Sequence, residues 1–219
     1  MADKKYELTK ETIEWDGYIL HRIKALKDFA DVKKGDIGGW IEKESNLSQE
    51  GNCWIYDEGK VYEDARISDN ASILGEALVE DNAMVSGSAQ IFSFAHIYGR
   101  TLISEEATIF GHASVCDFAC ITGRAKIGGR SKIYGKAEIY EEAIVGGTAD
   151  VSGYSYIKGQ SYLHGDTKVF GNTTIGGEVH LDTGIISNGY WVNQKAIDEL
   201  LGLQKNTIEN FDNIHFTEI

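Results

Sequence analysis

The sequence predicts an all-β protein whose core is a parallel β-helix of hexapeptide repeats. An aliphatic residue occupies every sixth position from Ile55 to Leu181, twenty-two positions with no register slip. Four residues after each aliphatic comes a second column, almost all Ala, Ser or Thr, and two residues after it the chain prefers Gly or Asp. A period of six that holds one turn and one short strand builds a triangular coil with both columns inside. Three hexapeptides make one coil, so we expect about seven coils over residues 53–186.

The turns of these coils are predicted at the Gly and Asp positions, such as Asp69, Gly75 and Gly87. These residue types tolerate the positive φ angles that tight turns require. The small column continues to Thr173, and only Val179 and Ile185 at its end are larger. The chain has no proline, which fits a fold in which each coil donates backbone N–H groups to its neighbour.

Residues 1–52 do not follow the repeat and are predicted to form an N-terminal β cap. Apolar and polar residues alternate over 11–15 and 18–26 on either side of Asp16-Gly17, a strong hairpin signal. A turn is expected at Gly38-Gly39-Trp40. Because the open end of a coil stack exposes unpaired backbone groups, a segment that covers it is expected.

Residues 187–219 are predicted to form a C-terminal helix and tail. Apolar residues recur at helical spacing between Asn193 and Leu203, with Asn193 as the N-cap and Gly202 near the end. The helix is expected to close the other end of the β-helix or to join an oligomer. The tail from Lys205 to Ile219 is amphipathic and is expected to pack on a neighbouring chain.

Composition narrows the environment and the partners. The net charge of −13 and pI near 4.9 argue against general nucleic-acid binding, although an acidic surface also serves solubility. The sequence shows neither a transmembrane run nor a signal-peptide core, so no membrane association is expected. Cys53, Cys116 and Cys120 are odd in number and lack a metal spacing, which favours reduced thiols in the cytoplasm.

The N-terminal stretch resembles a known family. The residues that carry the likeness are Asp28-Phe29, Asp31-Val32, Gly38-Gly39-Trp40, Leu47-Ser48-Gln49, Gly51 and Cys53-Trp54-Ile55-Tyr56-Asp57. They resemble the YdcK-like hexapeptide-repeat proteins, which are found in enterobacteria and in phage or prophage genomes and are labelled transferases. The likeness is specific over residues 19–72 and generic over 73–186. It implies a left-handed β-helix and a homo-oligomer, most simply a trimer, but it supplies no catalytic residue.

One outer face of the predicted coils is strongly apolar. Positions 18 apart stack about one strand spacing apart, so the face on Ile55 and Ile73 carries Trp54, Tyr56, Leu74, Phe92 and Phe110, with Phe94 beside it. Such a stack is too apolar to remain exposed to water. Three explanations are open: the hairpin or the C-terminal helix covers it, it is an oligomer contact, or it is a groove for a hydrophobic ligand.

A second outer face is the best candidate for chemistry. The predicted ligand-binding residues are His96, Tyr98, Arg100, His112, Arg130, Lys132 and Tyr134, with Lys136 beside them at a corner. Cations and aromatic rings in this arrangement suit an anionic nucleotide or the phosphates of coenzyme A. The alternative is that these are the ordinary polar ladders of an outer β-face.

Two functions follow from these patterns. The repeats run without an insertion, so no loop is available to shape an acceptor pocket, which favours a non-enzymatic binding or inhibitor protein of phage or prophage type. Such a protein would bind a nucleotide-like molecule or a host protein in the host cytoplasm, possess no cofactor and no metal, and act in counter-defence. The alternative is an acyl-coenzyme A-dependent acetyltransferase or acyltransferase. Its base would be His112 or His96, with Arg130 and Lys132 near the pyrophosphate of acetyl-coenzyme A.

Overall fold

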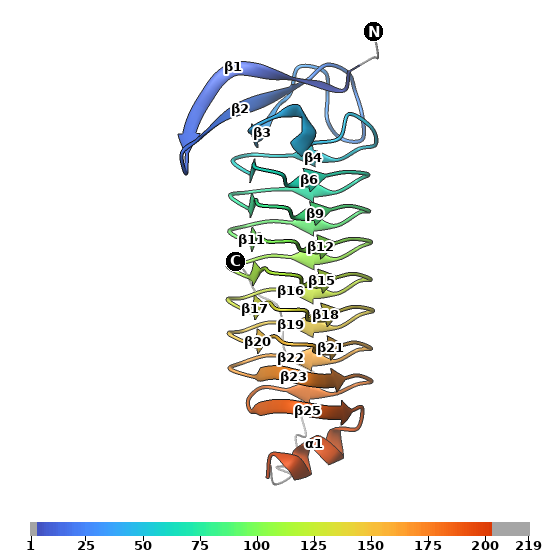
Figure 1. Cartoon of the computed structure of the whole chain (residues 1–219). Helices are drawn as coiled ribbons and strands as arrows, with labels where there is room; N and C mark the ends of the chain where they lie inside the picture. The colour runs from blue at the N-terminus through green and yellow to red at the C-terminus, as the bar shows by residue number, and fades with distance from the viewer. Residues whose placement is uncertain (1–3, 203–219) are drawn as a thin grey trace.

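The computed structural model describes residues 4–202, which form a column of triangular coils (Figure 1). Each hexapeptide contributes one two-residue strand and one turn, and strands 18 residues apart pair in parallel, as Ile91 does with Ile73 and Ile109. The predicted left-handed parallel β-helix is therefore confirmed. Because twenty-two hexapeptides fill slightly more than seven coils, one of the three faces has eight strands.

The strands divide into three faces. The first face holds β4 (Trp54–Ile55), β7 (Ser72–Ile73), β10 (Gln90–Ile91), β13 (Thr108–Ile109), β16 (Lys126–Ile127), β19 (Ile144–Val145), β22 (Tyr162–Leu163) and β24 (His180–Leu181). The second face holds β5 (Lys60–Val61), β8 (Leu78–Val79), β11 (His96–Ile97), β14 (Ser114–Val115), β17 (Lys132–Ile133) and β20 (Asp150–Val151). The third face holds β6 (Arg66–Ile67), β9 (Met84–Val85), β12 (Leu102–Ile103), β15 (Cys120–Ile121), β18 (Glu138–Ile139) and β21 (Tyr156–Ile157). Strand β23 (Lys168–Ile175) turns the corner from the second face to the third and so extends both.

The core is the interior of the column. Each of the twenty-two predicted aliphatic residues is at most 2% exposed, and the small column beside them is buried as well. One prediction at the C-terminal end was wrong: Ile185 is 61% exposed, and Ile186 is buried instead. The reason is that the last coil is shorter, because Val169 pairs with Ile186, seventeen residues later.

The turns use the predicted Gly or Asp in the left-handed region, with Glu or, at Ser93, Ser in a few of them, and the structure adds a contact between coils. The Asp117 backbone has a φ of 61°, and its Oδ2 accepts a hydrogen bond from the Gly135 N–H of the next coil at 3.0 Å. The same contact joins Asp57 to Gly75, Asp69 to Gly87, Asp81 to Gly99, Glu105 to Gly123 and Glu141 to Gly159. Each carboxylate therefore ties one turn to the turn of the coil that follows it.

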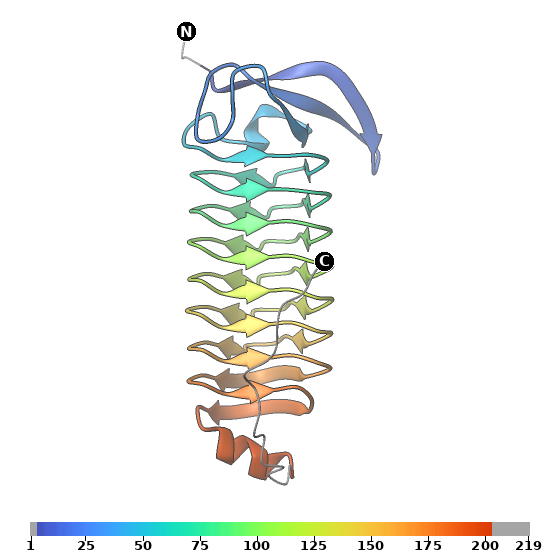
Figure 2. The ribbon, with the colours of Figure 1, turned by 180° about the vertical axis from the view of Figure 1, so that it is seen from behind.

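The N-terminal segment forms the predicted hairpin and then joins the coil stack. Strand β1 (Tyr6–Trp15) pairs antiparallel with β2 (Tyr18–Ala25), and β2 pairs with β3 (Ile37–Ile41). Strand β3 lies parallel to β5, and after the 3-10 turn η1 (Glu44–Asn46) Leu47 pairs with Ile67. The hairpin is thus a continuation of the second face. It projects beyond the column on the side of β11, β17 and β20, as both views show (Figures 1 and 2).

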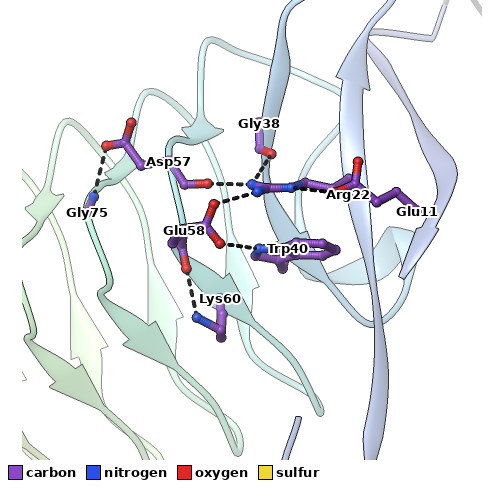
Figure 3. Close-up of polar contacts among 8 residues, drawn as sticks. All are labelled: Glu11, Arg22, Gly38, Trp40, Asp57, Glu58, Lys60 and Gly75. Atoms are coloured by element: carbon purple, nitrogen blue, oxygen red, sulfur yellow. Dashed lines mark hydrogen bonds and ion pairs between the residues drawn. The ribbon is translucent and has the colours of Figure 1, made fainter. Parts of the chain in front are cut away.

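Arg22 links this cap to the first coil (Figure 3). Its guanidinium donates to the backbone oxygens of Gly38 at 3.2 Å and Asp57 at 2.7 Å, and it forms an ion pair with Glu58. It also lies 4.1 Å from the ring centre of Trp40, whose Nε1 donates to Glu58 Oε2 at 2.9 Å. These contacts satisfy backbone groups that the open end of the coil stack would otherwise leave unpaired.

The C-terminal end is closed by a strand and a short helix. Strand β25 (Ile185–Trp191) pairs with β23, and helix α1 (Gln194–Leu200) follows it. The Asn193 side chain accepts from the Lys195 N–H at 2.9 Å, which confirms the predicted N-cap, and Ile197 is buried against the core. The tail from Lys205 to Ile219 lies outside the described residues. Within 4–202, no helix has the length and apolar character needed to span a membrane.

Candidate functional site

The N-terminal hairpin covers the upper part of the second face. Leu20, Trp40 and Tyr62 form a small buried cluster, against which Tyr18 and Leu78 pack. At the hairpin tip the Tyr18 hydroxyl donates to Glu63 Oε1 at 2.6 Å, and this bond raises the pKa of Tyr18 to about 12. Leu78 marks the edge of the covered region, and the next residues of the second face follow it.

Beyond Leu78 on this face come Glu80, which follows β8, and His96, which begins β11. His96 Nε2 lies 2.7 Å from Glu80 Oε1, and the two side chains are 38% and 18% exposed. The Tyr98 ring lies beside them, with its centre 4.5 Å from the His96 ring centre. When Nε2 donates to the carboxylate, Nδ1 carries the free lone pair of a neutral imidazole. A histidine oriented in this way is suited to accept a proton from a substrate.

Tyr98 connects this pair to the next coil. Hydrogen bonding with Cys116 raises the pKa of Tyr98, and Ser114 acts in the opposite direction. Burial raises the pKa of the Cys116 thiol above its ordinary value. Cys116 is therefore protonated near neutral pH and is unsuited to act as a nucleophile, since the thiolate is the reactive form.

His112 lies elsewhere, at the corner between the first and second faces. Its ring stacks on that of Phe94, with centres 4.9 Å apart and planes 4° apart, and Arg130 occupies the same corner one coil further. Within residues 4–202 the His112 side chain has no hydrogen-bond or ion-pair partner. The structure therefore groups His112 with an aromatic ring and a cation, and it gives an oriented imidazole to His96 instead.

The predicted cations flank the face and do not all meet at one point. Lys132 and Tyr134 lie on the face, whereas Arg100 is at the opposite corner from Arg130, 5.8 Å from the ring centre of Phe118. At that corner Lys136 Nζ lies 5.0 Å from the ring centre of Tyr154. The predicted ligand residues therefore form a broad surface about the width of one face, with His96 and Tyr98 at its hairpin end.

This surface carries several cations, in a chain with a net charge of −13. In the described part of the chain, Arg100, Arg130 and Lys132 form no ion pair, whereas Arg124 at the third corner lies between Glu106 and Glu142. Asp150 is opposite Lys132 on the next strand, and its Oδ1 is buried without a hydrogen-bond partner. Cations without carboxylate partners, interleaved with rings, are suited to an anionic ligand.

The apolar stack on the first face is partly an internal contact. Trp54 is 1% exposed, because the rings of Tyr6 and Phe29 pack against it with centres 6.3 and 5.4 Å away. Tyr56 donates its hydroxyl to Asp31 Oδ1 at 2.8 Å within the same chain. The N-terminal segment covers this end of the stack, so an oligomer contact through Trp54 is ruled out by its burial.

The rest of the stack remains at the surface and half-buried. The rings of Phe92 and Phe110 lie parallel, with centres 5.4 Å apart and planes 11° apart, and Phe110 covers Gly128. A Cβ at Gly128 would lie 2.3 Å from Phe110 Cζ, so the absence of a side chain there lets the ring lie flat on the coil. An oligomer contact through Leu74, Phe92 and Phe110 stays a prediction.

Sequence reasoning missed two features of the site. Glu80 lies sixteen residues before His96, so the two side chains meet diagonally across neighbouring strands, whereas the eighteen-residue rule pairs His96 with Leu78. The position of the hairpin against the second face was also missed. Contacts such as that of Tyr18 with Glu63 join residues that are not related by the repeat. A search for carboxylates sixteen or twenty residues from each outward histidine would have found Glu80.

The chain is similar in part to known proteins. No family model matches the chain. The chain is 41% identical over 85 residues to a protein named "Uncharacterized acetyltransferase YdcK" from Escherichia coli (strain K12), a match that covers 35% of this chain and 26% of that protein. The matched part is thus about a quarter of the relative's length. Among solved structures, UDP-N-acetylglucosamine acyltransferase from Campylobacter jejuni matches with a TM-score of 0.34 and 16% identity, over 68% of this chain and 70% of that one. Over those 85 residues the chain is similar to a YdcK protein, which agrees with the resemblance to the YdcK-like proteins predicted from the sequence.

Proposed function

We propose that the protein is an acetyltransferase or acyltransferase of the hexapeptide-repeat class, with the Glu80–His96 pair as its general base. The observation that carries the proposal is the 2.7 Å contact between Glu80 and His96 on a partly exposed face bordered by unpaired cations. The name of the Escherichia coli relative supports the same activity. Both favour the second interpretation of the sequence over a non-enzymatic phage inhibitor.

The chemistry follows from the orientation of the imidazole. His96 Nδ1 would take the proton from an acceptor hydroxyl or amine as that group attacks the thioester carbonyl of the acyl donor. Glu80 would stabilise the imidazolium that forms and keep the ring in the tautomer with Nδ1 unprotonated. Acetyl-coenzyme A is the expected donor, and Arg130 and Lys132 would hold its phosphates.

The hairpin removes an objection to catalysis. The uninterrupted repeats leave no inserted loop to shape an acceptor pocket, and this absence favours a non-enzymatic protein. In the structure, the hairpin stands at the end of the face next to Glu80, with Trp15 40% exposed and Ile19 52% exposed. A wall supplied from the end of the column serves the same purpose as an insertion within it.

A homotrimer in the cytoplasm forms part of this proposal. Leu74, Phe92 and Phe110 leave a half-buried apolar strip on the first face, and neighbouring subunits would cover it. Sedimentation of the purified chain checks this point, because a monomer at micromolar concentration would contradict it.

The test is an acyl-transfer assay on the purified chain with acetyl-coenzyme A and a panel of amino sugars, polyamines and hydroxylated acceptors, read by thiol release and product mass. We expect His96→Ala to lower kcat/KM by about 10²–10⁴-fold with a similar KM for acetyl-coenzyme A. Glu80→Gln should reduce kcat less, and Arg130→Ala should raise that KM. The control is His164→Ala on the first face, which should leave turnover unchanged.

The outcomes separate the alternatives. If His112→Ala abolishes turnover and His96→Ala does not, the assignment of the base is wrong. If the chain binds acetyl-coenzyme A or a nucleotide stoichiometrically but forms no product with any acceptor, the first interpretation, a ligand-sequestering protein, gains the support. In that case Arg100→Ala or Arg130→Ala should weaken the complex, because those cations lack carboxylate partners in the described residues.

A further inference from the structure

A lysine and a cysteine lie buried together where the N-terminal segment meets the first coil. Lys5 directly precedes β1 and is 1% exposed, and Cys53 directly precedes β4 and is 0% exposed. Lys5 Nζ lies 3.2 Å from Cys53 Sγ. It also donates to the backbone oxygens of Cys53 at 2.9 Å and of Glu50 at 3.3 Å.

This arrangement has a structural cause. The backbone oxygens of residues 50 to 53 belong to the first coil, and the Lys5 amine occupies a position where an earlier coil would supply donors. A buried amine is costly unless it is hydrogen-bonded, and these oxygens meet that need. The thiol lies close to Nζ because Cys53 occupies the inward position of the same coil, where it is fully buried.

The surroundings also affect the protonation of both groups. Burial lowers the pKa of Lys5, which increases the fraction of neutral, nucleophilic amine. Burial raises the pKa of the Cys53 thiol, and the positive charge of Lys5 acts in the opposite direction. Both shifts favour the neutral thiol and the neutral amine. The Lys5 amine, 3.2 Å from Sγ, can accept the thiol proton as the sulfur attacks an oxidant and return it to the departing oxygen, so the thiolate forms during the reaction.

We propose that Lys5 and Cys53 form an oxidative modification site, at which peroxide creates a covalent bond between Sγ and Nζ. In the first step the Cys53 thiolate attacks hydrogen peroxide and, after protonation, yields a sulfenic acid and water. In the second step the neutral Lys5 amine attacks that sulfur and releases a second water, which leaves a sulfenamide. The sulfur is oxidised and the peroxide is reduced, and the protein loses two hydrogen atoms overall.

The bond would fasten the hairpin segment to the coil stack. It closes a loop from residue 5 to residue 53 that contains the whole hairpin and the turn η1. A cross-link of this span is expected to raise the unfolding midpoint by roughly 5–10 °C, mainly by restricting the unfolded chain. Cys116 and Cys120 provide an internal comparison, because no lysine is hydrogen-bonded to either of them within residues 4–202.

The experiment uses the full chain with Cys116→Ser and Cys120→Ser, so that Cys53 is the one remaining thiol. After peroxide treatment, denaturation and thiol alkylation, intact mass and tandem mass spectrometry are measured. We expect a species two hydrogens lighter, resistant to alkylation, with a peptide that joins residues 5 and 53 and is released by reducing agent. Lys5→Arg keeps a buried cation that can donate to the same oxygens but lacks the amine nucleophile, and it should give no such species.

Other outcomes would overturn the proposal. A Cys53 thiol that remains alkylatable after peroxide, or that proceeds to sulfinic acid without a link to Lys5, shows that the bridge does not form. The same loss of two hydrogens in Lys5→Arg would place the bond elsewhere. The cross-linked peptide is read from a chain that retains both residues, so the result does not depend on whether Lys5→Arg folds.

Discussion

Gly99→Ala is expected to destabilise the column by about 2–5 kcal/mol. Gly99 has a φ of 76°, and a Cβ placed there would lie 2.6 Å from the backbone N and 2.9 Å from the backbone O of Asp117 in the next coil. The left-handed conformation costs an alanine about 1–2 kcal/mol. Moving a backbone that is fixed by coil pairing adds about 1–3 kcal/mol. Only the second contribution depends on the stacking of turns eighteen residues apart.

The matched control is Gly17→Ala in the hairpin turn. Gly17 has a φ of 83°, but a Cβ there would meet no atom within 4 Å. This variant should therefore show only the conformational cost of about 1–2 kcal/mol. Urea unfolding followed by far-ultraviolet circular dichroism gives both values. If Gly99→Ala is no less stable than Gly17→Ala, the turns are not in close contact and the proposed cost of stacking is wrong.

Three further predictions test the coil and the cap. Ile109→Ala should cost about 2–5 kcal/mol in the same urea unfolding measurement, because it leaves a cavity in a fully buried column. Asp117→Ala should cost about 1–2 kcal/mol, since it removes the bond to the Gly135 N–H, and Asp117→Asn should retain part of the stability. Hydrogen bonds from Trp40 and then Arg22 lower the pKa of Glu58 below 4.5. The stability that Glu58 contributes is therefore present above pH 4.5 and lost as the pH falls through its lowered pKa. Hydrogen exchange in the cap should show this loss in the native chain and not in Glu58→Gln.

The β-helix could be predicted because its inward positions accept only aliphatic or small side chains. These positions recur every six residues, so the period can be recognised from the amino-acid sequence alone. The prediction failed where the spacing changes. Ile41 and Leu47 are buried above Val61 and Ile67, twenty residues earlier instead of eighteen, so the first aliphatic positions were hidden.

The site could be predicted only in part, because outward positions obey no such constraint. The period placed His96, Tyr98 and Lys132 on one face correctly. It could not indicate which histidine has an acidic partner, since the Glu80 contact is diagonal and depends on side-chain rotamers. It also could not place the hairpin, whose position depends on contacts between residues about forty apart, such as Arg22 with Glu58.

The interior of the β-helix says little about function, whereas its outer faces and its N-terminal cap say more. Inside the column, every coil repeats the same packing, so the interior of a binding protein and that of an enzyme need not differ. Distinguishing features are therefore limited to the outer ladders and to the segments that close the ends. Glu80 and His96 lie where these two meet: they are on the second face, in the coils next to the hairpin. The proposed base at that junction would have the hairpin on one side and cations without ion-pair partners on the other. The proposed acyl transfer should therefore respond to substitutions at the hairpin tip such as Trp15→Ala, although Trp15 is far from His96 in sequence.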